Sequence, residues 1–204
     1  MSLSILHILL KIQSVFSRKM HLEIPQVISF RYFSEPTAPI LDLGGGGAGV
    51  IGQLYQRKVT AIDLRQDELD EAPDGPKKVC CDARALPFEA WSYPTVTAFY
   101  FLMYLLPGDI LAVLQEAYRC LQKDGSLYIW DTLIPKRGTS KKTLFAVPVQ
   151  AILPHKTIHT AYGVQWEHHT LEIDALVKML EEVGFTVIER TLTGSAFYLH
   201  VHKS

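Results

Sequence analysis

Cysteine is scarce in this sequence, with three among 204 residues: Cys80, Cys81 and Cys120. An odd and sparse set, without Cys-x-x-Cys spacing, excludes a disulfide-stapled scaffold and a zinc ribbon. Reduced, partly buried thiols in a cytoplasmic protein are the interpretation that this pattern favours.

An excess of either charge is also lacking. The chain has 20 Lys and Arg residues against 21 Asp and Glu residues, which gives a net charge of -1. Such a balance creates no global field that would attract nucleic acid or an anionic membrane. Histone-like, polybasic and acidic-tail proteins are therefore excluded, and we expect no nucleic-acid partner.

Long hydrophobic runs are missing as well. The apolar-rich stretch from Leu3 to Leu10 is interrupted by Lys11, is too short to span a bilayer, and follows no basic residue. Apolar residues from Ile5 to Phe16 recur at helical spacing. We expect an amphipathic helix packed on the domain and no membrane partner. A helix on a membrane surface is the alternative, which the few cations on its polar face disfavour.

Short apolar runs alternate with helical patterns over most of the remaining chain. Strands buried on both faces and alternating with helices indicate an α/β fold with a parallel sheet of βαβ units. Two final strands are joined by residues 191–195, a link too short for a crossover helix, so the last strand must run antiparallel. We expect one domain over 1–204, with a helical cap at 1–37 and a lid-like insertion at 133–169. The expected strands are 40–43, 59–63, 77–82, 96–101, 126–131, 185–190 and 196–202.

The most informative stretch is Ile40-Leu-Asp-Leu-Gly-Gly-Gly-Gly-Ala-Gly49, a buried strand that ends in glycines. Glycines allow a sharp turn and remove the Cβ atoms that would hold a ligand away from the backbone. Asp63 ends the next strand about 20 residues on, where a carboxylate can accept bonds from ribose hydroxyls. This spacing fits a dinucleotide or another adenosyl ligand. Asp82 at the end of the third strand can accept from an adenine amine, which favours the second.

At this point the chain resembles the class I S-adenosylmethionine-dependent methyltransferases. Five segments carry the resemblance, in the family's order and spacing. They are Ile40-Leu-Asp-Leu-Gly-Gly-Gly, Ala61-Ile-Asp63, Cys81-Asp-Ala-Arg-Ala-Leu-Pro-Phe88, Tyr118-Arg-Cys-Leu-Gln-Lys-Asp-Gly-Ser-Leu127 and Leu180-Glu-Glu-Val-Gly-Phe185.

The resemblance implies a Rossmann-like, doubly wound, seven-stranded, mostly parallel sheet in the order 3-2-1-4-5-7-6, with an antiparallel final strand. It also implies S-adenosylmethionine as the cofactor and methyl transfer as the reaction. By this resemblance, the glycine turn contacts the methionine half of the cofactor. The two acidic strand ends contact the ribose and the adenine, and aromatic side chains line the pocket near the methyl group. The residues are Asp42, Gly44, Gly45, Gly46, Asp63, Leu64, Asp82, Ala83, Phe99 and Tyr100.

One departure from the family concerns the acceptor. Many members read Leu-His-His-Leu after the fourth strand, whereas this chain reads Leu102-Met-Tyr-Leu105, so Tyr104 is the candidate polar contact. Within 133–169, His155, His159 and Trp166 are further candidates for the acceptor site. The two histidines have a spacing that suits a metal on a helix, but Pro154 and Gly163 make a long helix there unexpected, and no metal is predicted. No catalytic residue is assigned.

Several functions remain open from the sequence. A methyltransferase acting on a small molecule, as a monomer or homodimer, is the leading hypothesis. A relative that binds the cofactor without turnover, and a methyltransferase acting on protein or nucleic acid, are the alternatives. A nicotinamide oxidoreductase is disfavoured by Asp82 and by the antiparallel final hairpin.

Overall fold

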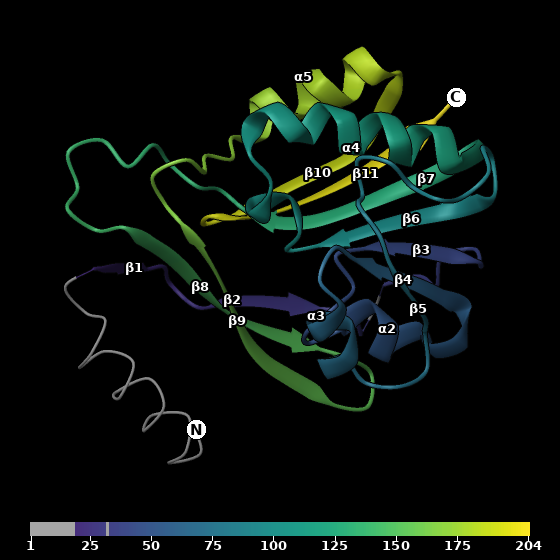
Figure 1. Cartoon of the computed structure of the whole chain (residues 1–204), viewed down its shortest axis with the longest axis horizontal. Coiled ribbons are helices and arrows are strands. Elements are labelled where there is room, and N and C mark those ends of the chain that lie inside the picture. The colour runs from purple at the N-terminus through teal and green to yellow at the C-terminus, as the bar shows by residue number, and fades with distance from the viewer. Residues whose placement is uncertain (1–18, 32) are drawn as a thin grey trace.

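The computed structural model describes residues 19–31 and 33–204, which form two β-sheets and the helices that flank them (Figure 1). The helix expected between Ile5 and Phe16 lies outside the described residues. None of the described helices is long and apolar enough to cross a membrane.

The main sheet has seven strands in the order β5-β4-β3-β6-β7-β11-β10, which confirms the predicted order. Strand β11 pairs antiparallel with β7 and with β10, and the other pairings are parallel, so the antiparallel final strand is confirmed too. The strands are β3 (Ile40–Leu43), β4 (Val59–Asp63), β5 (Lys77–Cys80), β6 (Tyr93–Phe99), β7 (Leu121–Thr132), β10 (Phe185–Thr193) and β11 (Ala196–Lys203).

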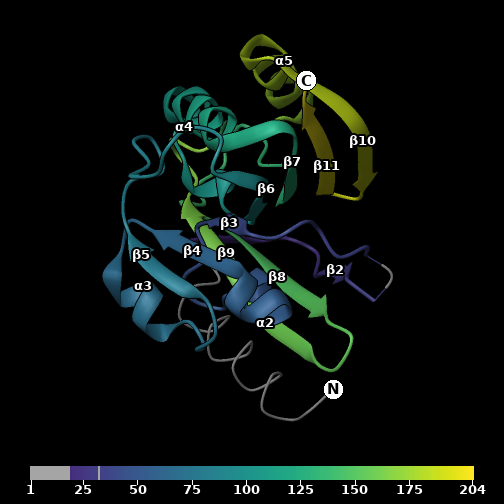
Figure 2. The same ribbon diagram turned by 90° about the vertical axis from the view of Figure 1, so that its right-hand side faces the viewer.

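Helices cover both faces of the main sheet (Figures 1 and 2). One face carries α2 (Val50–Tyr55) and α3 (Gln66–Glu71), with the 3-10 turn η1 (Gln56–Lys58) between α2 and β4. The other face carries α4 (Pro107–Cys120) and α5 (Ile173–Val183). The sheet is therefore doubly wound, as expected.

The start of β7 differs from the sequence-based expectation. This strand was expected over 126–131, but α4 ends at Cys120 and β7 begins at once with Leu121. Leu121 is fully buried and pairs with Tyr93, while its carbonyl accepts a bond from Lys203 Nζ at 2.8 Å. These contacts draw the chain into the sheet early. The register shifts beyond this pair, and Asp124 within the irregular stretch has a φ of 60°.

A second, small sheet contains β1 (Met20–Leu22), β2 (Gln26–Ser29), β8 (Leu144–Ile152) and β9 (Thr157–Gln165). Strands β8 and β9 form an antiparallel hairpin, and β1 and β2 pair in parallel with β8. The expectation of a helical cap is therefore wrong for residues 20–29. The 133–169 segment contains regular strands, because alternate β8 side chains face the core: Phe145, Val147, Val149 and Ala151.

The small sheet packs on the face of the main sheet that also carries α2 and α3 (Figure 2). Phe30, just after β2, packs against Trp130 of β7 with ring centroids 5.2 Å apart. Tyr162 of β9 stacks on Tyr100, which follows β6, at 4.9 Å and 7°. The β8–β9 hairpin thereby comes close to the carboxyl ends of the central strands.

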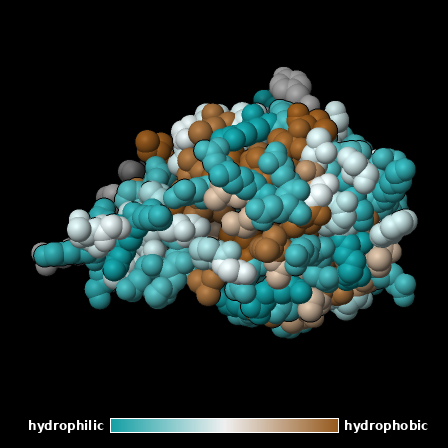
Figure 3. Space-filling model, turned by 90° about the horizontal axis from the view of Figure 1, so that it is seen from above, coloured by the Kyte–Doolittle hydropathy of each residue, from teal (hydrophilic) through white to brown (hydrophobic). Residues whose placement is uncertain are grey.

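The opposite face, with α4 and α5, is seen in Figure 3, where hydrophobic residues reach the surface among polar ones. A cavity of 210 Å³ lies on this side, lined by Ile110 of α4 and by Ala175 and Met179 of α5. The residues predicted to bind a cofactor lie elsewhere, at the strand ends.

Candidate functional site

The carboxyl ends of β3, β4 and β5 lie side by side and open into one cavity of 190 Å³. Five of the predicted cofactor residues line it: Gly44, Asp63, Leu64, Asp82 and Ala83. Ligands of open α/β sheets bind outside the carboxyl ends of the strands, so this cavity has the expected position.

The glycine turn after β3 leaves no room for side chains. Gly44 has a φ of +70°, and a Cβ there would overlap the ring of Phe101. A Cβ on Gly45 would meet Asp42 Oδ2 at 2.7 Å, and one on Gly46 would meet Asp63 Oδ2 at 2.8 Å. The glycines therefore let the backbone pass directly beside two carboxylates.

Asp42 lies beneath the turn, 2% exposed, and does not line the cavity. Its Oδ1 accepts a hydrogen bond from the hydroxyl of Thr97 at 2.7 Å. Burial, and to a lesser extent the charge of Asp63, raise the pKa of Asp42 to about 7, against the opposing effect of the Thr97 bond. Asp42 is thus placed to support the turn from inside the sheet.

Asp63 and Asp82 make the same local bond at neighbouring strand ends. Asp63 Oδ1 accepts the backbone N–H of Arg65 at 3.0 Å, and Asp82 Oδ1 accepts that of Arg84 at 2.8 Å. A carboxylate that bonds the backbone two residues on folds the chain into a turn and fixes its own direction. The side chain of Arg84 also bonds Asp82, and this pairing holds the pKa of Asp82 below its usual value.

The opposite wall of the cavity comes from residues that the sequence analysis missed, apart from Tyr104. Phe101, Leu105 and Leu106 surround the 3-10 turn η2 (Leu102–Tyr104), and Asp109 lies in the first turn of α4. The sequence signal was weak, because these residues lie far along the chain from the glycine turn and come beside it through the pairing of β3 with β6.

Asp131, at the end of β7, holds this wall from behind. The fully buried carboxylate accepts the backbone N–H groups of Thr132 at 2.8 Å and Met103 at 3.2 Å. Burial raises the pKa of Asp131 to about 7, opposed by backbone bonds that include those from Leu102 and Phe101. Asp131 therefore caps η2, a role that the sequence analysis did not assign.

Phe99 and Tyr100 lie under the site and not on the cavity wall. Phe99 is 6% exposed and Tyr100 is 1% exposed. The hydroxyl of Tyr100 donates to Gln26 Oε1 of β2, and its ring stacks on Tyr162. Contact of either residue with a methyl group would require it to leave this packing.

The candidate acceptor residues separate into two groups. Tyr104 lines the cavity, and its hydroxyl accepts the backbone N–H of Gly163 in β9 at 3.2 Å. Trp166 is buried against Phe145 and donates to the carbonyl of Pro135, away from the cavity.

The histidines also lie apart from the cavity. His155 is exposed in the turn of the β8–β9 hairpin, and His159 is exposed on β9. Hence they do not share a helical face. Among residues 19–31 and 33–204, no group of three His, Cys, Asp or Glu side chains could hold a metal ion.

The central region of the chain is similar to a known protein family. Residues 41–129 match the family described as methyltransferase domain. This region of the chain is therefore similar to a methyltransferase domain. The resemblance predicted from the sequence is confirmed over this region, and the solved structures that share the fold include ones described as S-adenosylmethionine-dependent methyltransferases.

Solved structures share the fold of this chain at low sequence identity. A Methanosarcina mazei structure titled as an S-adenosylmethionine-dependent methyltransferase has a TM-score of 0.58 at 16% identity, covering 84% of this chain and 94% of its own. The PH0226 protein of Pyrococcus horikoshii has a TM-score of 0.60 at 18% identity, covering 84% of each chain. The structure of the [4+2]-cyclase SpnF has a TM-score of 0.58 at 15% identity, covering 85% of this chain and 78% of its own. No curated protein sequence matches this chain.

The residues of the cavity fit the adenosyl half of S-adenosylmethionine better than the whole molecule. Two carboxylates and a backbone free of Cβ atoms suit ribose, adenine and a closely approaching ligand. A volume of 190 Å³ is nevertheless below the range of about 300–1,000 Å³ of typical ligand pockets. Phe101, whose ring lies against Gly44, bounds the cavity beside the glycine turn.

Proposed function

We propose that the cavity at the ends of β3, β4 and β5 holds the adenosyl half of S-adenosylmethionine and that the acceptor is a small molecule. Asp63, with Leu64 beside it, would bind the ribose. Asp82, with Ala83, would bind the adenine amine, and the turn from Gly44 to Gly46 would contact the methionine half. The observation that carries this assignment is that Gly44, Asp63 and Asp82 line one cavity.

The β8–β9 hairpin supports a small acceptor enclosed beneath a lid. Gly163 bonds Tyr104 on the cavity wall, and at the turn of the hairpin Lys156 Nζ donates to Gln53 Oε1 of α2. These bonds fasten the hairpin to both sides of the glycine turn. We assign 133–169 the function of excluding water and bounding the acceptor site, with Tyr104 as its polar contact.

The chemistry asks little of the protein beyond position. Bound S-adenosylmethionine supplies a methyl group that its sulfonium already activates for in-line displacement. The residues of this chain orient the two reactants and keep the site dry. Asp42 and Asp131 are occupied by Thr97 and by backbone N–H groups, so neither is assigned as a base. An acceptor that is already nucleophilic needs none.

A second candidate is a protein that uses this fold without methyl transfer. This candidate is supported by the similarity to a structure described as a [4+2]-cyclase. It is also supported by Tyr104, which stands where many members of the family have a histidine. Methylation of nucleic acid has less support, because the net charge is -1.

Incubation of the protein with S-adenosylmethionine and three substrate panels separates these candidates. The panels are small nucleophiles, peptides and RNA, and mass spectrometry reports the addition of a methyl group. The proposal predicts methylation within the first panel. Methylation of peptides or RNA alone would contradict the small acceptor. Binding of S-adenosylmethionine with turnover in no panel would favour the second candidate.

Hydrogen exchange across 133–169 tests the lid. The proposal predicts added protection of β8 and β9 when S-adenosylhomocysteine and an accepted substrate are both present. Protection confined to the glycine turn would mean that the hairpin is an ordinary structural element.

A further inference from the structure

The guanidinium of Arg84 connects the two walls of the cofactor cavity. On one wall, Nη2 donates to Asp82 Oδ2 at 2.7 Å, and Nε lies 3.1 Å from each oxygen of the same carboxylate. On the other wall, Nη1 donates to Asp109 Oδ1 in the first turn of α4 at 3.0 Å. All three residues line the cavity.

These bonds determine which way the Asp82 carboxylate faces. The backbone N–H of Arg84 holds Oδ1, while its guanidinium fork holds both oxygens. Bidentate pairing of arginine with a carboxylate gives directional precision that a lysine ammonium cannot reproduce. The remaining acceptor directions of Asp82 are thus fixed before a ligand arrives, and pre-organised acceptors lose less on binding.

We propose that Arg84 is a positioning residue that sets the preference for an adenine amine by fixing Asp82. The inference rests on the proposed function, in which Asp82 receives that amine. Arg84 itself touches no adenine atom in this scheme; it holds the acceptor in place and ties it to α4 through Asp109.

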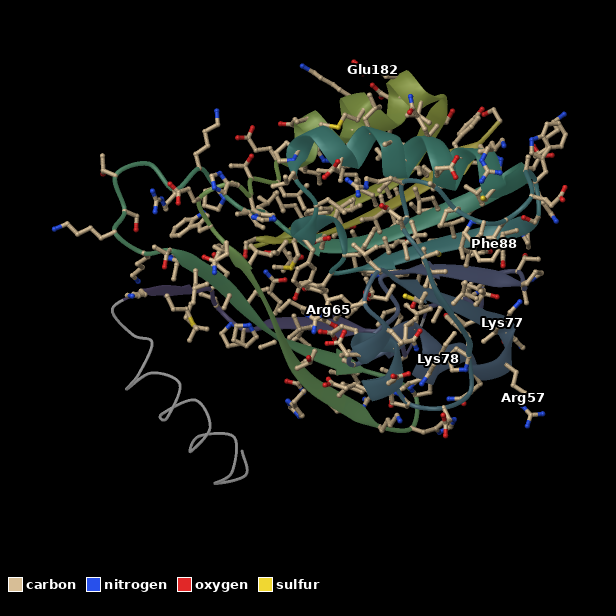
Figure 4. All side chains as sticks on the ribbon, viewed as in Figure 1. Arg57, Arg65, Lys77, Lys78, Phe88 and Glu182 are labelled. Carbon is tan, nitrogen blue, oxygen red and sulfur yellow. The ribbon has the colours of Figure 1, made fainter. Side chains whose placement is uncertain are left out.

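The chain offers a matched control in Arg65. Arg65 pairs with Asp67, two residues away, just as Arg84 pairs with Asp82, and it follows the neighbouring strand β4. Figure 4 labels Arg65 beside α3. Unlike Arg84, Arg65 is not one of the residues that line the cavity. Both arginines are partly exposed, at 62% and 45% of the side chain, so glutamine at either position should fold normally.

The test is calorimetric titration of the full chain with two ligands. One is S-adenosylhomocysteine, and the other is its analogue with hydrogen in place of the adenine amine. The wild type should prefer the first roughly tenfold or more, the effect of one charge-assisted hydrogen bond. Arg84→Gln and Arg84→Lys should both reduce that preference to about threefold or less, through weaker binding of the amine-bearing ligand. Arg65→Gln should keep the wild-type preference.

Two results would overturn the role of Arg84 while leaving the proposed function intact. Equal weakening of both ligands in Arg84→Gln would mean that Arg84 shapes the cavity in general. Unchanged binding would make it a surface ion pair. Failure of the proposed function has a different signature: the wild type itself would bind no S-adenosylhomocysteine or show no preference between the ligands, and the inference would fall with it.

Discussion

The carboxylate of Asp131 accepts the backbone N–H of Met103 at 3.2 Å, so the end of β7 holds the turn that carries Tyr104. This bond joins two neighbouring strand ends of the main sheet at the cavity. It gives the buried Asp131 a structural role that can be tested apart from any ligand.

Asp131→Ala should lower the free energy of unfolding by roughly 2–4 kcal/mol, because it leaves buried N–H groups without an acceptor. Urea denaturation followed by circular dichroism measures the change. Asp174→Ala is the control, since the Asp174 side chain is 81% exposed and pairs only with Arg190 among the described residues. A loss no larger than that of the control would show that η2 does not depend on Asp131.

The pKa of Asp42, raised by burial from 3.8 to about 7, predicts a pH-dependent stability. A raised pKa in the folded state means that the native protein binds more protons than the unfolded chain. The contribution of Asp42 is therefore fully present below about pH 4 and is lost as the pH rises to about 7, at roughly 1 kcal/mol per pH unit.

Asp42→Asn exchanges no proton and should lack this component. Denaturation of both proteins between pH 4.5 and 7.5, at intervals of about half a unit, gives the comparison. Parallel pH profiles for the two proteins would mean that the folded pKa of Asp42 is close to its unfolded value.

The glycine turn and the strand ends could be predicted because their signals are local. Ile40 to Leu43 is a short apolar run that ends in glycines, and each acidic residue directly follows a predicted strand. The order of the main sheet followed from the resemblance. The antiparallel last strand followed independently from a short link, which the structure closes as the turn Gly194-Ser195 between β10 and β11.

The small sheet could not be predicted in the same way. Strands β1 and β2 are short, and within 19–31 and 33–204 they pair only with β8, far along the chain. The second wall of the cavity could not be predicted for the same reason, since it is formed by segments that are far apart in the sequence. Arg84 and Asp109 acquire their roles from a contact between α4 and the segment after β5, which neither local pattern contains.

Gly46→Ala should weaken S-adenosylhomocysteine binding about tenfold or more, because the added Cβ would meet Asp63 Oδ2 at 2.8 Å and Glu68 Cβ at 2.7 Å. Calorimetry measures the affinity. Gly108→Ala is the control, because a Cβ there meets nothing within 4 Å. If both variants bind like the wild type, the turn is not close to the ligand.

The central claim is that the end of β4 receives the ribose of an adenosyl cofactor, and titration of Asp63→Ala beside the wild type tests it most directly. Loss of a charged acceptor costs about 1.5–3 kcal/mol, so S-adenosylhomocysteine should bind the variant on the order of 10- to 100-fold more weakly. Its melting temperature without ligand should stay near that of the wild type, because the Asp63 side chain is only partly buried. Equal affinity of the two proteins, or tight binding of NADH by a wild type that binds no adenosyl sulfur ligand, would contradict the account.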